Sequence, residues 1–197
     1  MRKILIDETP LRADAQKNRE RILAAAEEVF LERGAGAAFE DVAKRAGVGI
    51  GTLYRRFPTR EELLAATYSA RFLSLAQASR ARDGKLDEAD ALRAYLEDLV
   101  LYTTVYRGFA ASLATVLQTG TPGCHATTEE GKRLLGRAQN ARVIRPDISF
   151  DDLVWVATAT SLAVERNGKP KPRIAHLVGL FFDGIGERRC TSRLPRK

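Results

Sequence analysis

A short helix, a glycine turn and a second short helix are predicted between residues 38 and 57, and this pattern limits the fold more than any other feature of the sequence. The first helix, over 39–46, has apolar residues at the i, i+3, i+4 and i+7 positions of one face, namely Phe39, Val42, Ala43 and Ala46. Gly47 supplies the turn because glycine adopts positive φ without Cβ strain. The second helix, over 50–57, directs Leu53 and Phe57 inward and leaves an outer face free, as in a helix-turn-helix.

The rest of the chain also has helical periodicity, and no period-2 strand pattern or internal repeat stands out. Further helices are predicted at 14–33, from 59 onward, and at 87–106, 108–118, 129–141, 150–166 and 173–186, with a Gly/Pro-rich loop at 119–128. A polar break at 80–85 separates a domain over 14–68 from a helical domain over 85–187, with flexible tails at 1–13 and 188–197. The predicted fold is therefore all-α, with a three-helix helix-turn-helix domain followed by a C-terminal helical domain.

Two predicted helix starts have strong capping signals. Thr59 is followed three residues later by Glu62, which is the spacing of a capping box. Ser149 stands in the same relation to Asp152 at the start of the 150–166 helix. Both patterns fix where a helix begins.

The net charge of +7 does not by itself identify a partner, because the whole excess lies at the C-terminal end. From residue 166 onward the sequence has nine basic residues and only two acidic ones, Asp183 and Glu187. The nine basic residues are Arg166, Lys169, Lys171, Arg173, Arg188, Arg189, Arg193, Arg196 and Lys197. The local pattern between residues 42 and 60 is more informative, because every charged residue there is basic: Lys44, Arg45, Arg55, Arg56 and Arg60. This cluster predicts a phosphate-facing surface, and the alternative is a solvated helix face.

The stretch from Ala38 to Tyr68, AFEDVAKRAGVGIGTLYRRFPTREELLAATY, resembles the DNA-binding domain of the TetR family of bacterial repressors. The matching positions are Val42-Ala43, Ala46-Gly47-Val48, Gly51-Thr52-Leu53-Tyr54, Phe57 and Arg60-Glu61-Glu62-Leu63. The resemblance covers about residues 14–68, and the segment 136–154 is similar to C-terminal domains of the family. It implies a transcriptional regulator, most simply a cytoplasmic homodimeric repressor that a small-molecule inducer releases from a palindromic operator in double-stranded DNA.

The resemblance also implies roles for single residues. Tyr54, Arg56 and Arg60 correspond to phosphate contacts, with Arg60 acting beside the N-terminal amides of its helix. Thr52 and Arg55 are expected to contact base edges, because arginine can bind guanine with two hydrogen bonds. The remaining members of the predicted DNA-binding set are Lys44, Gly49, Ile50, Gly51 and Thr59. The simpler alternatives are packing of Tyr54 against the first helix and a plain surface arginine at position 60.

Two departures from the family pattern affect the operator. Ala37 and Ala38 stand where the family has Thr or Ser, and Gly49 stands where serine is common. Both short helices therefore lack a side-chain N-cap, and one phosphate contact is expected to be missing. The operator sequence is not transferable from any relative.

The C-terminal domain is expected, from the resemblance, to dimerise and to bind a ligand. The predicted pocket is aromatic and apolar, and it consists of Tyr102, Tyr106, Phe109, Leu113, Leu117 and Trp155. The predicted dimer interface uses the 150–166 helix and the last helix, through Phe181, Phe182 and Ile185. For both sets the alternative is ordinary core packing within one protomer.

Other classes of function have weaker support. The sequence has no serine-hydrolase, zinc-protease or phosphate-loop signature, so no enzyme is predicted. Cys124, Cys190 and the two histidines lack metal-ligand spacing, and no metal or cofactor is expected. The apolar run Leu153–Val164 is shorter than the roughly 20 residues of a membrane span, and no signal peptide is evident. Two alternatives stay open: a protein-interaction module with a degenerate DNA head and, remotely, an enzyme using Glu165.

Overall fold

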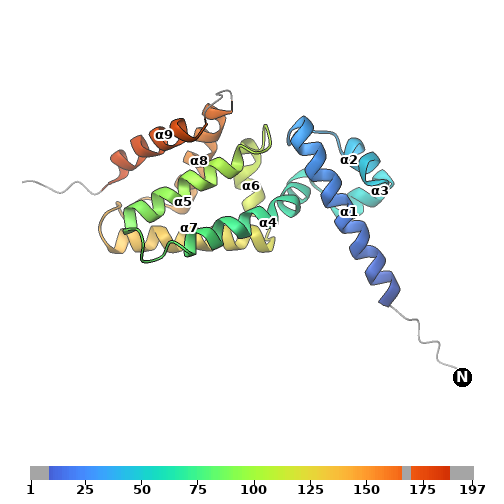
Figure 1. The fold of residues 1–197 in the computed structure, drawn as a ribbon, viewed down its shortest axis with the longest axis horizontal. Coiled ribbons are helices and arrows are strands. Elements are labelled where there is room, and N and C mark those ends of the chain that lie inside the picture. The colour runs from blue at the N-terminus through green and yellow to red at the C-terminus, as the bar shows by residue number, and fades with distance from the viewer. Residues whose placement is uncertain (1–8, 166–169, 187–197) are drawn as a thin grey trace, which may run out of the picture.

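The computed structural model describes residues 9–165 and 170–186, and every regular element within these ranges is a helix. Figure 1 shows an elongated molecule, with a small head at one end and a helical body at the other, joined by α4. The head contains α1 (Thr9–Arg33), α2 (Phe39–Ala46), α3 (Ile50–Arg56) and the start of α4 (Arg60–Arg80). The body adds α5 (Glu88–Thr103), a 3₁₀ turn (Ala110–Ser112), α6 (Leu113–Leu117), α7 (Pro122–Asn140), α8 (Phe150–Val164) and α9 (Pro170–Ile185). The predicted all-α class is confirmed.

One apolar core holds the head together. Its fully buried members come from each head helix and include Ile22, Val29, Phe30, Val42, Leu53 and Leu63. The bounds of α2 agree with the sequence prediction, and α3 ends one residue before the predicted position. Residues 9–13 of the predicted N-terminal tail are the first turns of α1. Residues 1–8 and the predicted tail at 188–197 lie outside the described residues.

Helix α4 runs from the head into the body and packs closely on α7. The Thr59 side chain accepts a hydrogen bond from the amide of Glu62, which is the N-cap half of the predicted capping box. Further along the seam, a Cβ at Gly123 of α7 would lie 2.2 Å from the carbonyl oxygen of Ser69. Only glycine allows the two backbones to approach this far, and the Gly123 amide donates to Ser69 Oγ at 3.0 Å. α4 therefore belongs to both parts of the molecule.

The predicted loop at 119–128 is wrong, because α7 begins at Pro122. Thr121 caps this helix by accepting from the amide of Cys124, and proline fits the first helical position because that residue needs no N–H partner. The glycine at 123 serves close helix packing instead of a turn. The predicted continuous helix at 108–118 is also wrong, since a 3₁₀ turn precedes the short α6.

A buried charge network joins α4 to α7. The Glu130 carboxylate of α7 accepts hydrogen bonds from Ser79 Oγ at 2.7 Å, Arg80 Nε at 3.0 Å and Arg133 Nη2 at 2.8 Å. Burial raises the pKa of this carboxyl, but the bonds from Arg133, Ser79 and Arg80 outweigh it and lower the pKa to about 2. Glu130 is therefore ionised at neutral pH, and each of its charged partners comes from α4 or α7.

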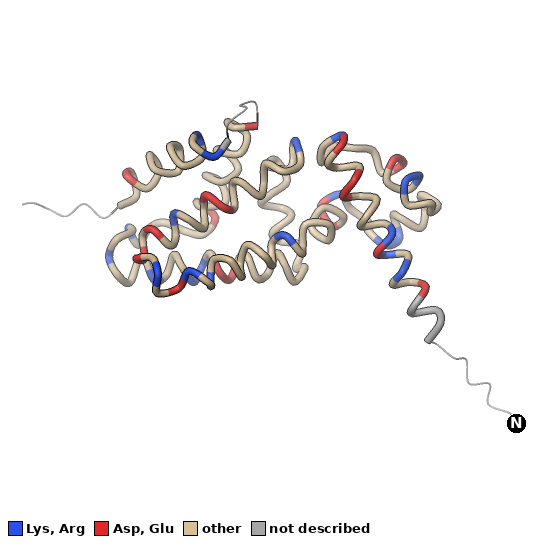
Figure 2. Tube along the Cα trace, viewed as in Figure 1, with Lys and Arg blue, Asp and Glu red and all other residues tan. Residues whose placement is uncertain are grey.

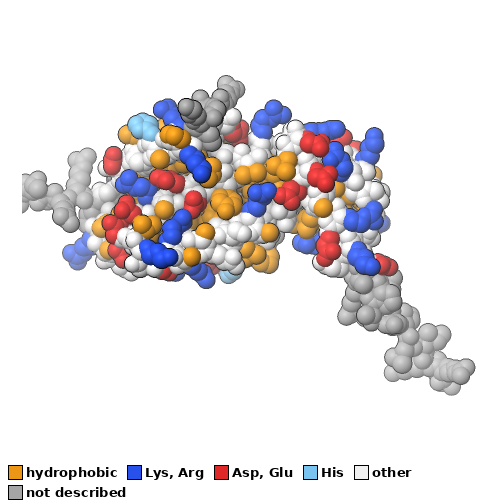
Figure 3. All heavy atoms as spheres, viewed as in Figure 1, with side chains coloured by type: hydrophobic (Ala, Val, Ile, Leu, Met, Phe, Trp, Pro, Cys, Tyr) orange, Lys and Arg blue, Asp and Glu red, His pale blue; other side chains and the backbone are white. Residues whose placement is uncertain are grey.

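Aromatic side chains fill the junction between head and body. The ring of Tyr68 in α4 stacks on Phe109 at a centroid distance of 4.1 Å and meets Tyr106 edge-on at 4.6 Å. Phe30 of α1 lies 5.9 Å from the Tyr106 ring. The segment after α5 is also tied to the end of α1, since the amide of Ala35 donates to the carbonyl of residue 107 at 2.8 Å. On the molecular surface, hydrophobic side chains also gather in the middle of the face shown in Figure 3.

The last two helices close the body. Ser149 and Asp152 form the predicted capping box at the start of α8, with both reciprocal bonds present. The amide of Arg145 donates to the carbonyl of Ile185 at 3.1 Å, which fixes the end of α9 against the turn before α8. Among the helices in the described ranges, none combines the length and apolar character needed to cross a membrane.

Candidate nucleic-acid interface and regulatory surfaces

The turn between α2 and α3 sets the direction of α3. Gly47 has φ 63° and ψ 38°, the left-handed conformation that glycine adopts without strain. The amide of Val48 then donates to the carbonyl of Ala43 at 3.0 Å, which closes the C-terminus of α2. Neither Ala38 nor Gly49 provides a side-chain cap for the helix that follows it. The orientation of α3 therefore depends on the buried Leu53 and on the glycine turn.

The outer face of α3 brings together most of the predicted DNA-binding residues. Gly49, Ile50, Gly51, Tyr54, Arg55 and Arg56 are exposed, and Thr52 is half-buried. Arg55 Nη2 lies 3.2 Å from Thr52 Oγ1, so the two predicted base-contacting side chains form one unit. A Cβ added at Gly51 would meet no atom within 4 Å. This face is open to a large partner.

The basic residues of the head fall into two groups. Lys44, Arg55 and Arg56 are exposed, and none of them forms an ion pair with a carboxylate in the described part of the chain. Arg45, in contrast, donates to Glu28 at 2.9 Å and to Glu32 at 2.9 Å on α1. Figure 2 shows acidic and basic positions interleaved along α1. The uniform positive patch predicted over residues 42–60 is therefore smaller than its sequence suggests.

Arg60 points into the head. Its Nη1 donates to the carbonyls of Ala35 at 2.9 Å and Ala37 at 2.6 Å, and its guanidinium lies 5.5 Å from the centre of the Phe39 ring. These bonds hold the connection between α1 and α2 against the start of α4. The Arg60 guanidinium, which was predicted to contact a phosphate, is thus bonded within the head. The neighbouring Thr59 is exposed and caps α4.

Tyr54 combines packing with exposure. Its ring lies 5.1 Å from that of Phe39, so it packs on α2, whereas the sequence alternative placed it on α1. The side chain remains 48% exposed. A tyrosine that packs through its ring and stays about half exposed suits a phosphate contact.

Helix α1 contributes two arginines that the sequence analysis missed. Arg21 Nη2 donates to the carbonyl of Ala46 at 2.7 Å and so caps the end of α2. Arg19 lies 5.9 Å from the centre of the Phe57 ring and lines, with Thr52, Arg55 and Arg56, a groove of about 240 Å³ between α1 and α3. The only available signal was the basic spacing on α1, which the nearby acidic residues conceal.

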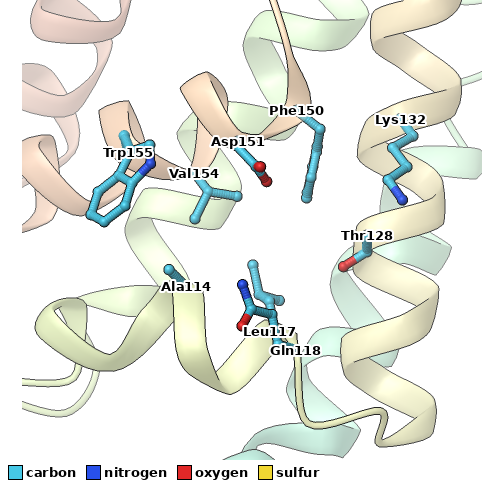
Figure 4. Close-up of a pocket in the computed structure, with 9 residues that line it drawn as sticks. All are labelled: Ala114, Leu117, Gln118, Thr128, Lys132, Phe150, Asp151, Val154 and Trp155. Atoms are coloured by element: carbon cyan, nitrogen blue, oxygen red, sulfur yellow. The ribbon is translucent and has the colours of Figure 1, made fainter.

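The residues predicted to line the ligand pocket lie in two different places in the structure. Tyr106, Phe109 and Leu113 are fully buried in the packed core, and Tyr102 is half-buried beside it. Leu117 and Trp155, however, line a cavity of about 350 Å³ between α6, α7 and α8. Figure 4 shows that Gln118, Thr128, Lys132 and Asp151 direct polar groups toward the same space. The cavity is therefore more polar than the predicted pocket.

The predicted dimer residues lie mostly inside the protomer. Phe182 is 4% exposed and Ile185 is 6% exposed, and Arg93 packs its guanidinium 5.3 Å from the Phe182 ring centre. Phe181 is half-buried. The apolar side chains that α8 and α9 expose are different ones: Trp155 at 63%, Leu162 at 48% and Leu180 at 56%. The helical periodicity identified the apolar residues of α9, but it did not reveal which of them other helices of the same protomer cover.

The residues considered as candidates for catalysis or metal binding are Glu165, the cysteines and the histidines. Glu165 accepts from the amide of Gly108 at 3.0 Å, so it closes the end of α8. The Cys124 thiol is buried and donates to the carbonyl of Val116, and burial raises its pKa. His125 and His176 are exposed, and Cys190 lies outside the described residues. No group of three or more potential metal ligands occurs within residues 9–165 and 170–186.

Two family descriptions match the chain. Residues 22–67 match "Bacterial regulatory proteins, tetR family", and residues 87–187, about half of the chain, match "Transcriptional regulator SbtR-like, C-terminal domain". The regulator CymR of Pseudomonas putida is 38% identical over 86 residues, which are 43% of this chain and 42% of CymR. The chain thus spans less than half the length of this curated relative.

Solved structures match over a longer range. The TetR regulator SCO0520 of Streptomyces coelicolor is 34% identical, with a TM-score of 0.53 over 86% of this chain and 99% of that one. RolR, solved in complex with resorcinol, is 21% identical, with a TM-score of 0.62 over 94% of this chain and 98% of RolR. The second likeness concerns the fold alone.

Proposed function

This chain belongs to the TetR family of bacterial transcriptional regulators, and we propose that it acts as a homodimeric repressor released from a palindromic operator by a small molecule. It is a transcriptional regulator with a helix-turn-helix DNA-binding domain. The observation that carries the proposed mode of DNA binding is the outer face of α3, where exposed arginines have no carboxylate partners among the described residues. The proposal includes a cytoplasmic location, where such a regulator meets DNA, and no catalytic step.

The proposed DNA contacts divide into two kinds. Lys44, Arg56 and the Tyr54 hydroxyl contact phosphates and fix the register of α3 in the major groove. Arg55, held by Thr52 at 3.2 Å, contacts base edges. Arg60 positions the head through the carbonyls of Ala35 and Ala37 instead of binding a phosphate directly.

The proposed dimer uses α8 and α9. Trp155 and Leu162 on α8 and Leu180 on α9 offer the exposed apolar surface that two protomers would bury together. A two-fold interface of this kind places two α3 helices in successive major grooves, about 34–36 Å apart. The buried Phe182 and Ile185 support these helices from inside the protomer.

The proposed regulation links the body to the head. RolR has been solved with resorcinol, which supports a small-molecule site in this chain as well. A ligand that prefers a state in which the two heads are wrongly spaced lowers DNA affinity by linkage. α4 is the structural connection, because it begins in the head and packs along α7.

Selection of bound DNA from a random pool, followed by a salt titration of the enriched sequence, tests this function. A palindrome with a steep dependence of affinity on salt is expected, because each neutralised phosphate adds about one unit to the slope. If no sequence is enriched, the chain does not recognise a specific operator, and the protein-interaction alternative gains support. Enrichment of an asymmetric site would exclude the symmetric dimer.

A further inference from the structure

We propose that the cavity between α6, α7 and α8 binds a small aromatic acid that carries a hydrogen-bond donor at the opposite end of its ring. The inference rests on the proposed ligand-responsive function and names the site and the chemical class of the ligand. The cavity has a volume of about 350 Å³, near the lower end of the roughly 300–1,000 Å³ usual for ligand sites. Its size favours a single ring over a long-chain ligand.

The middle of the cavity is apolar. Leu117 of α6 and Val154 of α8 are both buried and contribute aliphatic walls, and the ring of Phe150 is half-buried at the start of α8. Figure 4 shows Phe150 between Asp151 and Thr128, with Leu117 on the opposite side of the space. An aromatic ring placed here gains contact with both aliphatic and aromatic surfaces.

The charged groups come from two different helices and carry opposite charges. Lys132 extends from α7, and Asp151 extends from the first turn of α8. They form no ion pair with each other, and the Lys132 ammonium only approaches Glu129 at 3.9 Å, on an exposed surface. Lys132 can therefore bind an anionic group, and Asp151 can accept from a hydroxyl or an amine. A ligand with both groups satisfies both walls.

Thr128 supplies a second observation at this cavity. Its hydroxyl oxygen is buried and has no hydrogen-bond partner among the described residues. Buried hydroxyls are usually paired, because an unpaired one loses its bond to water. In Figure 4 the hydroxyl points toward the space that Lys132 also faces. The wall of the cavity beside Lys132 therefore contains an unpaired polar atom.

Trp155 connects the cavity to the rest of the proposed mechanism. It lines the outer edge of the cavity, and it is 63% exposed on the α8 surface that also carries Leu162. A bound ligand would therefore contact a side chain of the proposed dimer face. Since Trp155 is the single tryptophan of the chain, its fluorescence reports specifically on this edge of the cavity.

The test titrates the full-length protein, without DNA, with 4-hydroxybenzoate and 4-aminobenzoate, and with benzoate and phenol as ligands that each lack one group. Calorimetry gives the affinity, and Trp155 emission gives the location. The two-group acids are expected to bind at least about tenfold more tightly than benzoate or phenol, because each adds a charge-assisted hydrogen bond. Equal affinities, or no binding and no change in emission, would overturn the proposal.

Two substitutions assign the groups. Lys132→Gln should weaken both acids about tenfold and leave phenol unchanged. Asp151→Asn should reduce the advantage of the para donor, because a neutral amide oxygen accepts a weaker bond, and leave benzoate unchanged. Lys85→Gln and Asp90→Asn are matched controls, because both residues are exposed and lie away from the cavity. If the controls weaken binding as much as the cavity variants do, the acids bind by general charge and the proposal is wrong.

The failure of this inference is distinguishable from failure of the proposed function. Addition of the acids to the protein bound to its selected operator provides the second readout. If the acids release DNA from the wild type but not from Lys132→Gln, the result supports both the cavity proposal and the proposed function. Operator binding without acid binding overturns only the cavity proposal. Acid binding in the cavity without any release of DNA supports the site and contradicts ligand-released repression through it.

Discussion

The outer face of α3 and the seam between α4 and α7 are both rich in arginine, but they use it in opposite ways. On α3, Arg55 and Arg56 are exposed and have no carboxylate partner among the described residues. In the seam, Arg80 and Arg133 both bond to the buried Glu130, and Arg133 also contacts Asp83. On the proposed function, pairing, more than charge, separates the surface that contacts DNA from the one that stabilises the fold.

The same contrast holds for glycine. Gly123 in the seam lies against the backbone of Ser69, where even one added carbon would clash. Gly51 on α3 faces open space. The seam is therefore closed because its groups are already matched, whereas the α3 face is unmatched and available to a partner.

Gly123→Ala should have the largest effect on stability. The added Cβ would lie 2.2 Å from the Ser69 carbonyl oxygen, so α4 and α7 must separate, at a cost of about 3 kcal/mol in the free energy of unfolding. Urea denaturation at fixed protein concentration measures it. Gly136→Ala is the control on the same helix, because it meets no atom within 4 Å and should stabilise by roughly 0.5–1 kcal/mol. Similar effects of the two substitutions would show that the seam is not tightly closed.

Glu130 should make the protein acid-sensitive. Its folded pKa of about 2 lies below the usual unfolded value of about 4.3. The ionised carboxylate therefore stabilises the folded state fully above about pH 4.3, and this stabilisation is lost as the pH falls toward 2. Because Arg80 and Arg133 are partly exposed, solvent screening reduces the corresponding effect to on the order of 1–2 kcal/mol. Glu130→Gln should lower stability at neutral pH and flatten its pH dependence in denaturation curves between pH 5 and 2. The exposed Glu129→Gln is the control, and identical pH profiles for both variants would rule out the role of Glu130.

Arg55→Ala should weaken binding to the selected operator by about 1–3 kcal/mol and relax specificity at one base pair of each half-site. The reason is that its guanidinium, held beside Thr52, is free to reach a base edge. Competition binding against operators with single base changes measures both effects. Arg45→Ala is the matched control, because Arg45 is engaged with Glu28 and Glu32. Unchanged base preference in the Arg55 variant would place the base contacts elsewhere.

Gly51→Ala should have the smallest effect on stability and still affect DNA binding. Alanine favours helix by up to about 1 kcal/mol, and nothing within 4 Å opposes its Cβ. The operator affinity should nevertheless fall if DNA approaches the α3 backbone closely. Thermal unfolding and operator titration on the same samples separate the two quantities. Full operator affinity in this variant would mean that the backbone of α3 remains distant from the DNA.

The local features of the head were predictable from the sequence, because they depend on residues close together in the chain. The 39–46 helix, the Gly47 turn and the Thr59 cap each follow from spacing or from backbone preference. The family match and the all-α fold follow from the same short-range patterns. What could not be predicted in the head is the direction of Arg45 and Arg60, because their partners on α1 and in the 34–38 connection are distant in sequence.

The body was harder to predict, because its features depend on which helices meet. Gly123 and Pro122 are typical of a loop, but Thr121 and Pro122 begin a helix, and the closeness of α4 explains the glycine. The apolar stripe of α9 predicted Phe182 as an interface residue, but α5 and its Arg93 cover that ring within one protomer. Likewise, the aromatic residues around Tyr106 fill the core, and the cavity lies beside Trp155 instead.

The salt dependence of operator binding tests most directly whether unpaired arginines contact DNA and paired ones do not. The slope of log affinity against log salt should become shallower by about 0.9 in each protomer for Arg56→Ala, because one phosphate contact is lost. Arg45→Ala should leave the slope unchanged, since that guanidinium is already neutralised by Glu28 and Glu32. A slope that falls equally for both variants, or for Arg45→Ala alone, would contradict the distinction between the two groups.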